Sequence, residues 1–188
     1  MLSNKSEFGI ITRLDGSKSL RFNSTRAIEC CNFAIDNGLK NLSLDSDIYK
    51  DLDLKPILPL KTFVEELIID ENINISQIHD FTNLLSLSII GNKNNLVCLE
   101  KFIKLEALNV TFSKNLHGLD KCKKLKSLTI EGFKSKALDL SDLPLLPELN
   151  YLTIIKSDIA NLNGVEKFKL LNEINFWYCS KLESIESL

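Results

Sequence analysis

The sequence predicts an α/β solenoid, in which a curved parallel sheet forms one face and short helical segments cover the other. Three observations predict it. An apolar triplet spaced as LxxLxL recurs seven times, its first members lie 20 to 25 residues apart, and most intervening segments carry an apolar residue at every third position. Recurrence at this period indicates stacked supersecondary units that share one continuous core.

Each triplet predicts one strand of the parallel sheet. Side chains alternate between the two faces of a strand, so the fourth and sixth residues of each unit point into the core. The segment Leu149–Phe176 is the most regular example, because it contains two complete triplets. The seven triplets are Leu39-Leu42-Leu44, Val64-Leu67-Ile69, Leu84-Leu87-Ile89, Leu105-Leu108-Val110, Leu125-Leu128-Ile130, Leu149-Leu152-Ile154 and Leu171-Ile174-Phe176.

The segments between strands are predicted to form 3₁₀ turns on the convex face, because residues i and i+3 of a 3₁₀ helix lie on one side. Two longer segments contain proline pairs, Pro56 with Pro59 and Pro144 with Pro147. Proline is excluded from regular helix interiors, so both segments are expected to be loops. The apolar ladders are Ile75-Ile78-Phe81, Leu96-Leu99-Phe102, Leu116-Leu119-Cys122, Leu140-Leu143-Leu146 and Ile159-Leu162-Val165-Phe168.

Residues 1–38 lack the repeat pattern and are predicted to form an N-terminal cap made of a β-hairpin and a helix. Asp15 and Gly16 mark the hairpin turn, and Gly38 marks the helix end. Such a unit covers the edge of the first repeat strand. The repeats are assigned to residues 39–188, where no C-terminal cap is evident. Another ladder instead begins at Leu182, Ile185 and Leu188.

Over about residues 39–188 the pattern resembles the leucine-rich-repeat family, and the three-residue ladders resemble its internalin-like repeats of 20–25 residues. In that family the ninth residue of each unit is usually Asn, Cys, Ser or Thr, which satisfies backbone groups at the turn leaving the strand. Here that position holds, among others, Asn72, Asn92 and Cys179, whereas Asp47 and Phe133 depart from it. The resemblance implies a leucine-rich-repeat solenoid.

The third, fifth and seventh residues of each unit are expected on the concave face, with the eighth at its edge. The first two repeats bring carboxylates there and the last two bring aromatic residues, which are the types that anchor protein interfaces. The predicted partner-binding residues are Asp45, Glu66, Asp70, Glu71, Glu131, Tyr151, Ile155, Glu173, Trp177 and Tyr178. Two simpler interpretations stay open: the carboxylates are a solvated strand face, and Trp177 covers the C-terminal edge of the core.

The sequence offers little for catalysis or cofactor binding. It contains no HExxH, P-loop or GxGxxG motif, and the His79-Asp80 pair is expected to be solvated. We therefore predict no enzyme, cofactor or metal site. The net charge of −2 argues against nucleic-acid binding. An N-terminus without a signal-peptide pattern, no run of about 20 apolar residues, and five unpatterned cysteines predict a cytoplasmic protein that does not bind membranes.

The leading functional hypothesis is a non-enzymatic protein-binding module that uses its concave face. One form of it is a bacterial immunity or antagonist protein, whose acidic end would suit a basic partner. The alternative is a structural or homo-oligomeric component, with copies joined as a homodimer through the open C-terminal end.

Overall fold

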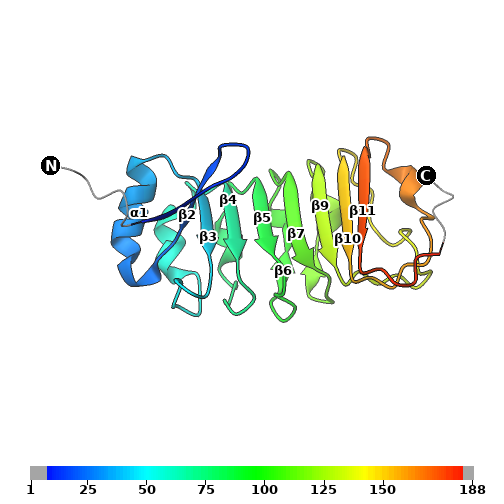
Figure 1. Ribbon diagram of the computed structural model, residues 1–188, viewed down its shortest axis with the longest axis horizontal. Coiled ribbons are helices and arrows are strands. Elements are labelled where there is room, and N and C mark those ends of the chain that lie inside the picture. Colours follow the sequence, from blue (N-terminus) through cyan, green and yellow to red (C-terminus); the bar gives the residue numbers. More distant parts are fainter. Residues whose placement is uncertain (1–7, 184–188) are drawn as a thin grey trace.

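The structure is a computed structural model that describes residues 8–183. Its main feature is a nine-stranded sheet that runs along the whole molecule (Figure 1). Only β1 and β2 are antiparallel, and every later strand is parallel to its neighbour. In spatial order the strands are β1 (Gly9–Thr12), β2 (Lys18–Arg21), β3 (Asn41–Leu44), β4 (Glu66–Ile69), β5 (Ser86–Ile89), β7 (Ala107–Thr111), β9 (Ser127–Glu131), β10 (Tyr151–Ile155) and β11 (Glu173–Trp177).

The seven predicted repeat strands are confirmed, and they pair in one register. Leu42, Leu67, Leu87 and Leu108 face one another across successive strands, and the same row continues through β9, β10 and β11. These leucines are buried, whereas the residues immediately before and after each of them along its strand are partly exposed. A shift of one residue would turn every leucine outward, so the alternation determines the register.

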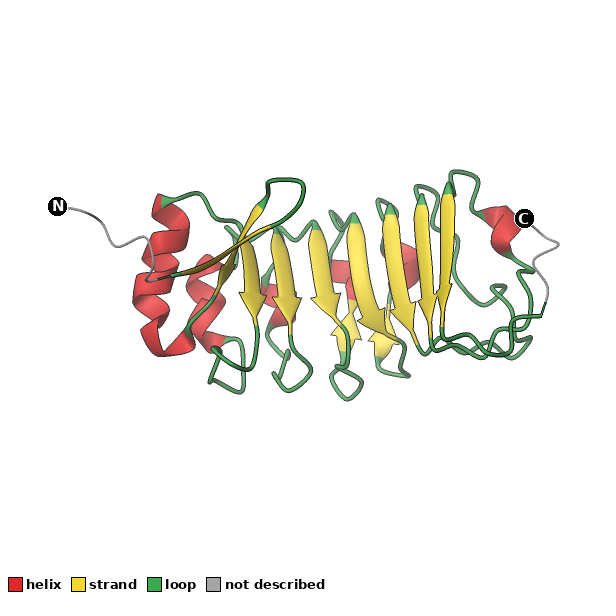
Figure 2. Ribbon diagram, viewed as in Figure 1, coloured by secondary structure: helices red, strands yellow, loops and turns green. Residues whose placement is uncertain are grey.

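The other face of the sheet is covered by short 3₁₀ helices, which lie behind the strands in Figure 2. All but the first of them begin at the second or third residue of a predicted apolar ladder, whereas the ladder Leu140-Leu143-Leu146 forms no 3₁₀ helix. A small parallel pair, β6 (Val97–Cys98) with β8 (Leu116–His117), accompanies them. The 3₁₀ helices are η2 (Lys55–Leu60), η3 (Ile78–Asp80), η4 (Leu99–Lys101), η5 (Leu119–Lys121) and η6 (Val165–Lys167).

A hairpin and a helix precede the repeats, and β2 of the hairpin pairs with β3. The 3₁₀ turn η1 (Ser24–Arg26) leads into α1 (Ala27–Asp36), and Gly38 follows with a positive φ. On this helix Cys31 and Ala34 are buried, whereas the apolar residues Ile28 and Ile35 are exposed. The helix packs against η2, which determines the side that is covered. Its role as a cap stays a prediction.

The first proline-containing segment is not a loop, contrary to the sequence prediction. It forms η2, the longest 3₁₀ helix of the described chain, which buries Ile57 and Leu60. Pro56 lies in the first turn of η2, where backbone N–H groups make no hydrogen bond within the helix, so the lack of an N–H costs nothing there. The φ of proline also suits a 3₁₀ helix. The second segment, with Pro144 and Pro147, is irregular as expected.

His79 is a structural residue rather than half of a solvated pair, so that expectation was wrong. Its ring is half-buried and stacks on Phe102, and its Nε2 accepts a hydrogen bond of 2.9 Å from the backbone N–H of Cys98. Burial, together with the nearby Lys101 ammonium, lowers the pKa of His79, and the opposing effect of Asp80 is smaller. The neutral imidazole therefore joins η3 to β6.

Lowering the pH from 7.5 to 5.5 is expected to reduce the free energy of unfolding. The folded pKa of His79 lies below its ordinary value of 6.5, so as pH falls the unfolded chain takes up this proton first. The contribution of neutral His79 to the free energy of unfolding is complete above about pH 6.5 and is lost as the pH falls below that value. Urea unfolding at both pH values tests this: His79→Gln should flatten the dependence, and His117→Gln, at an exposed site, should not. Equal slopes in the two variants would contradict it.

The last strand is less covered than the others. Leu171, Ile174 and Phe176 are half-buried, whereas the corresponding residues of earlier repeats are buried. Leu182 packs against the same core, and the remaining members of the predicted ladder, Ile185 and Leu188, lie outside the described residues. Within residues 8–183, no helix is long and apolar enough to span a membrane.

Candidate partner-binding surface

The sheet face opposite the 3₁₀ helices carries the third, fifth and seventh residues of each repeat, and we name it the open face. It corresponds to the predicted concave face. Between its two ends its side chains are mostly small and polar, as at Ser86, Ser127 and Thr129. The predicted site residues lie on this face or at its edge, as an acidic group at the N-terminal end and an aromatic group at the C-terminal end, with Glu131 between them.

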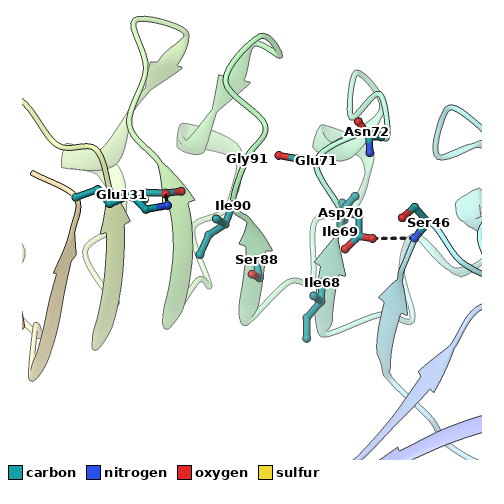
Figure 3. A pocket seen from close by; sticks show the side chains of 11 residues that line it. Ser46, Ile68, Ile69, Asp70, Glu71, Asn72, Ser88, Ile90, Gly91 and Glu131 are labelled. Carbon is teal, nitrogen blue, oxygen red and sulfur yellow. Dashed lines mark hydrogen bonds and ion pairs between the residues drawn. The ribbon is translucent and has the colours of Figure 1, made fainter. Parts of the chain in front are cut away.

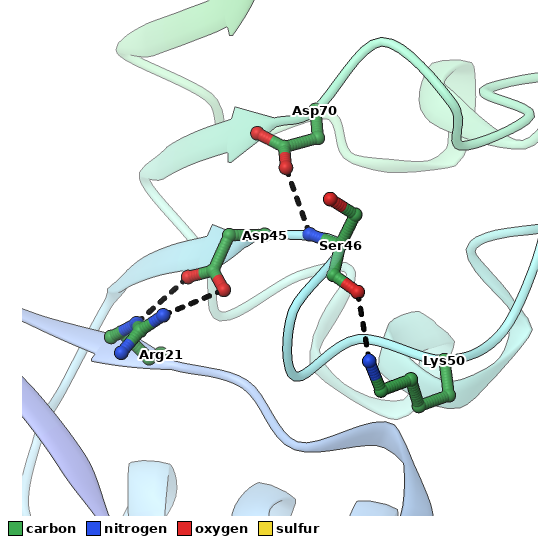
Figure 4. Close-up of polar contacts among 5 residues, drawn as sticks. All are labelled: Arg21, Asp45, Ser46, Lys50 and Asp70. Carbon is green, nitrogen blue, oxygen red and sulfur yellow. Dashed lines mark hydrogen bonds and ion pairs between the residues drawn. The ribbon is translucent and has the colours of Figure 1, made fainter.

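Two of the four carboxylates in the acidic group at the N-terminal end are neutralised within the chain. Arg21 on β2 donates from Nε and Nη2 to the two carboxylate oxygens of Asp45, at 2.8 Å each (Figure 4). Arg13, in the hairpin turn, makes a similar two-pronged pair with Glu66. The hairpin crosses in front of the first repeat strands in Figure 1, and the bond from Arg13 to Glu66 joins it to β4. These pairs orient the hairpin over the sheet.

Asp70 and Glu71 lie beside an open hollow of about 540 Å³ at the C-terminal ends of β4 and β5 (Figure 3). Asp70 Oδ2 accepts a hydrogen bond of 2.8 Å from the backbone N–H of Ser46, so this carboxylate joins two successive turns. The Glu71 side chain lies against Gly91 and is exposed. Neither carboxylate has a cationic side chain bonded to it among the contacts of the described residues.

Glu131, in the middle of the face, lines the far side of the hollow together with Lys156. Lys156 Nζ donates a hydrogen bond of 2.8 Å to Glu131, and the hydroxyl of Thr111 lies 3.2 Å from the other carboxylate oxygen. The bond from Lys156 holds the pKa of Glu131 below its usual range. Three of the predicted acidic residues are therefore already paired within the protein.

The aromatic group at the C-terminal end is exposed. The exposed fractions are 50% for Tyr151, 57% for Trp177 and 80% for Tyr178. Ile155 on β10 faces Trp177 on β11, and Tyr151 faces Glu173 in the same strand pair. Trp177 therefore stands on the open face, and its exposure disfavours the interpretation that it covers the core. Exposed aromatic residues gathered on one sheet face are typical of a protein-binding surface.

Tyr178 adopts a backbone conformation that is unfavourable for a residue with a side chain. Its φ is +57°, and the same eighth position of other repeats holds Gly91 and Gly132, also with positive φ. The left-handed conformation costs about 1–2 kcal/mol for an L-residue. Lys156 shares this conformation and forms an ion pair with Glu131. Tyr178 is largely exposed, which is the pattern of strain retained at a functional site.

Replacing Tyr178 with glycine is expected to leave the fold intact and to weaken partner binding. Glycine tolerates a φ of +57° without steric cost, so the free energy of unfolding should stay unchanged or rise by up to about 1 kcal/mol. Loss of the exposed ring should raise the partner's dissociation constant about tenfold. Chemical denaturation and a binding titration measure the two effects. A less stable variant would show that the ring contributes to the core.

The described residues offer no metal centre, since no group of three or more His, Cys, Asp or Glu side chains is close enough to hold an ion. All five cysteines are free, and burial raises the pKa of Cys122 to about 11. A thiol with so high a pKa is mostly protonated at neutral pH and is a poor nucleophile.

No protein-family model matches the sequence, and no curated protein matches it. Among solved structures, the fold is similar to internalin C2 from Listeria monocytogenes, with a TM-score of 0.50 and 15% identity over 73% of this chain. The chain has an internalin-like leucine-rich-repeat fold. It spans 61% of the internalin C2 chain, which is less than two thirds. The functional domain of InlJ from the same organism matches with a TM-score of 0.43 and 16% identity, over 79% of this chain and 34% of InlJ.

The leucine-rich-repeat register brings the predicted site residues onto one face but not into one cluster. Asp45, Glu66, Asp70 and Glu71 lie near the hairpin, and the aromatic group lies on the last two strands. Sequence analysis missed Arg13, Arg21 and Lys156, which neutralise three of the carboxylates. For the two arginines, their alternation with apolar residues in the hairpin was the available indication that they lie on the open face. It did not indicate which carboxylate each arginine pairs with.

Proposed function

We propose that this leucine-rich-repeat protein is a non-enzymatic interaction module that binds a partner protein on its open face. The observation that carries the proposal is the exposure of Tyr151 and Trp177 on two adjacent strands, and of Tyr178 directly after the second strand. Tyrosine and tryptophan supply large contact area with few rotatable bonds, so they dominate the binding energy of interfaces. Ile155 lies directly opposite Trp177 and adds apolar area beside it.

The partner that suits this surface is basic. Once Asp45, Glu66 and Glu131 are paired, the remaining carboxylates at or beside the open face are Asp70, Glu71 and Glu173. Their negative charge favours association with a positively charged protein and makes its association rate sensitive to salt. A bacterial immunity protein that neutralises a basic toxin is one form of this function. The free cysteines are consistent with the reducing cytoplasm that such a protein would occupy.

Affinity capture from the native source tests the proposal. The wild-type protein and Trp177→Ala are immobilised in parallel, and captured proteins are identified by mass spectrometry. We expect the wild type to retain a basic protein that Trp177→Ala does not retain. If that partner is a toxin, its gene should lie beside the gene of this chain. A partner held equally by both proteins would move the binding surface away from the aromatic patch.

A second candidate is self-association through β11. Its support is that Leu171, Ile174 and Phe176 are only half-buried, so a second copy would cover apolar area at that end of the core. In this case the protein is a structural or homo-oligomeric component. Sedimentation velocity at high and low concentration distinguishes the two: a concentration-dependent dimer that is weakened by Phe176→Asp supports self-association, and a monomer throughout opposes it.

A further inference from the structure

Tyr151 and Glu173 form an adjacent pair on the open face. They are directly opposite in the register of β10 and β11, and both side chains are exposed. Neighbouring strands lie about 4.8 Å apart, so a cation that rests on the Tyr151 ring is within reach of the Glu173 carboxylate. An aromatic face beside a carboxylate combines two attractions for a positive charge, one from the ring quadrupole and one from the anion.

Glu173 differs from the paired acids of the face in what it contacts. Asp45, Glu66 and Glu131 are each bonded to a cationic side chain. The Glu173 carboxylate instead accepts a hydrogen bond of 2.6 Å from the neutral amide of Asn175, which holds it in place and leaves its charge. Within residues 8–183, the contacts of Glu173 include no ion pair. The negative charge beside Tyr151 is thus oriented but not neutralised.

We infer that Tyr151 and Glu173 form a subsite for an arginine side chain of the partner protein, an inference that rests on the proposed function. The guanidinium stacks on the Tyr151 ring and donates to the Glu173 carboxylate. Arginine suits this pair better than lysine, because its planar group stacks on an aromatic ring and offers several donors at its edge. This subsite lies at the opposite end of the face from the acidic group that the sequence emphasised.

The register also determines what the partner presents next to that arginine. Trp177 lies four residues after Glu173 on β11, which corresponds to about 13 Å along the strand. Thr153 and Asn175, which are small and polar, lie between the two anchors. The partner therefore carries an arginine and a large apolar side chain roughly 13 Å apart. Four residues of extended chain span that distance.

A pair of short peptides that match in shape and differ in charge tests the subsite without the natural partner. Acetyl-Gly-Arg-Gly-amide and its citrulline equivalent, which is neutral and similar in shape, are titrated into ¹⁵N-labelled protein. We expect the arginine peptide to shift the amide signals of Tyr151 and Glu173, and the citrulline peptide to bind at least threefold more weakly. Glu173→Gln and Tyr151→Leu should each weaken the arginine peptide by about threefold to fivefold.

Glu148→Gln is the matched control, because it removes an exposed carboxylate that precedes β10 and lies outside the open face. It should leave the arginine peptide's affinity unchanged. Equal binding of the citrulline peptide, equal losses in Glu148→Gln and Glu173→Gln, or equal binding of a lysine peptide would each overturn the assignment. Failure of the subsite can be told apart from failure of the proposed function. If Trp177→Ala abolishes capture of the partner but Glu173→Gln does not affect it, the open face still binds the partner and only the arginine subsite is ruled out.

Discussion

Trp177→Ala is expected to weaken partner binding by at least about 30-fold, which corresponds to about 2 kcal/mol. Trp177 is the only tryptophan of the chain and more than half of its side chain is exposed on the last described strand. Its neighbour across the strand pair, Ile155, leaves it flanked by apolar surface. A large ring in such a position gains most of its interaction on binding, because little of it is buried beforehand.

The same substitution should hardly change stability, and this distinguishes a binding role from a packing role. Isothermal titration against the purified partner measures the loss of affinity, and thermal unfolding measures stability. Leu170→Ala is a suitable control, since Leu170 is also exposed but lies before β11 and outside the open face. If Trp177→Ala lowered the melting temperature substantially, the ring would be part of the terminal core and the proposed surface would lose its anchor.

Gly164→Ala is expected to cost about 2–5 kcal/mol of unfolding free energy, the largest effect of any single methyl group considered. Gly164 precedes η6 with a φ of +89°, and a Cβ there would lie 2.7 Å from the backbone nitrogen of Ser141. That backbone belongs to the preceding repeat, which is hydrogen-bonded to Asn163 through the N–H of Leu140. Neither backbone segment can move aside without breaking this link.

Gly132→Ala separates the two contributions to that cost. Gly132 also has a positive φ, of +70°, but nothing lies within 4 Å of its added Cβ. Only the backbone term of about 1–2 kcal/mol applies there. Urea denaturation followed by circular dichroism compares the two variants under identical conditions. Equal destabilisation would mean that the two repeats move apart easily at Gly164 and that their close contact contributes little.

The repeat core was predictable because its information is local. Leu128 and Ile130 point inward for the same reason as Leu152 and Ile154, since burial of one face requires alternation along each strand. The ladders likewise predicted where η3, η4, η5 and η6 begin, although the ladder Leu140-Leu143-Leu146 forms no 3₁₀ helix. Prediction failed at η2, where the general rule against proline in helices was applied to a short helix that admits Pro56 in its first turn.

The candidate site was predictable by face but not by charge. Alternation placed Tyr151, Trp177 and Glu66 on the outward side of their strands. The pairing of Arg13 with Glu66 joins residues that are 53 positions apart, and no periodic pattern connects them. For the same reason, the partner of His79 was not evident, since its acceptor role depends on the path of a neighbouring repeat.

By itself, the sequence determined the number of repeat strands, their register and the side on which each residue emerges, because these follow from burying one face of a strand with a two-residue period. The tertiary structure alone decided which charges are neutralised and which remain available. It folds the hairpin across β3 and β4, so the N-terminal carboxylates Asp45 and Glu66 meet arginines, and it leaves Glu173 beside Tyr151 without one. The physical reason is that periodicity encodes the neighbours within a repeat, whereas ion pairs depend on how distant segments are packed together.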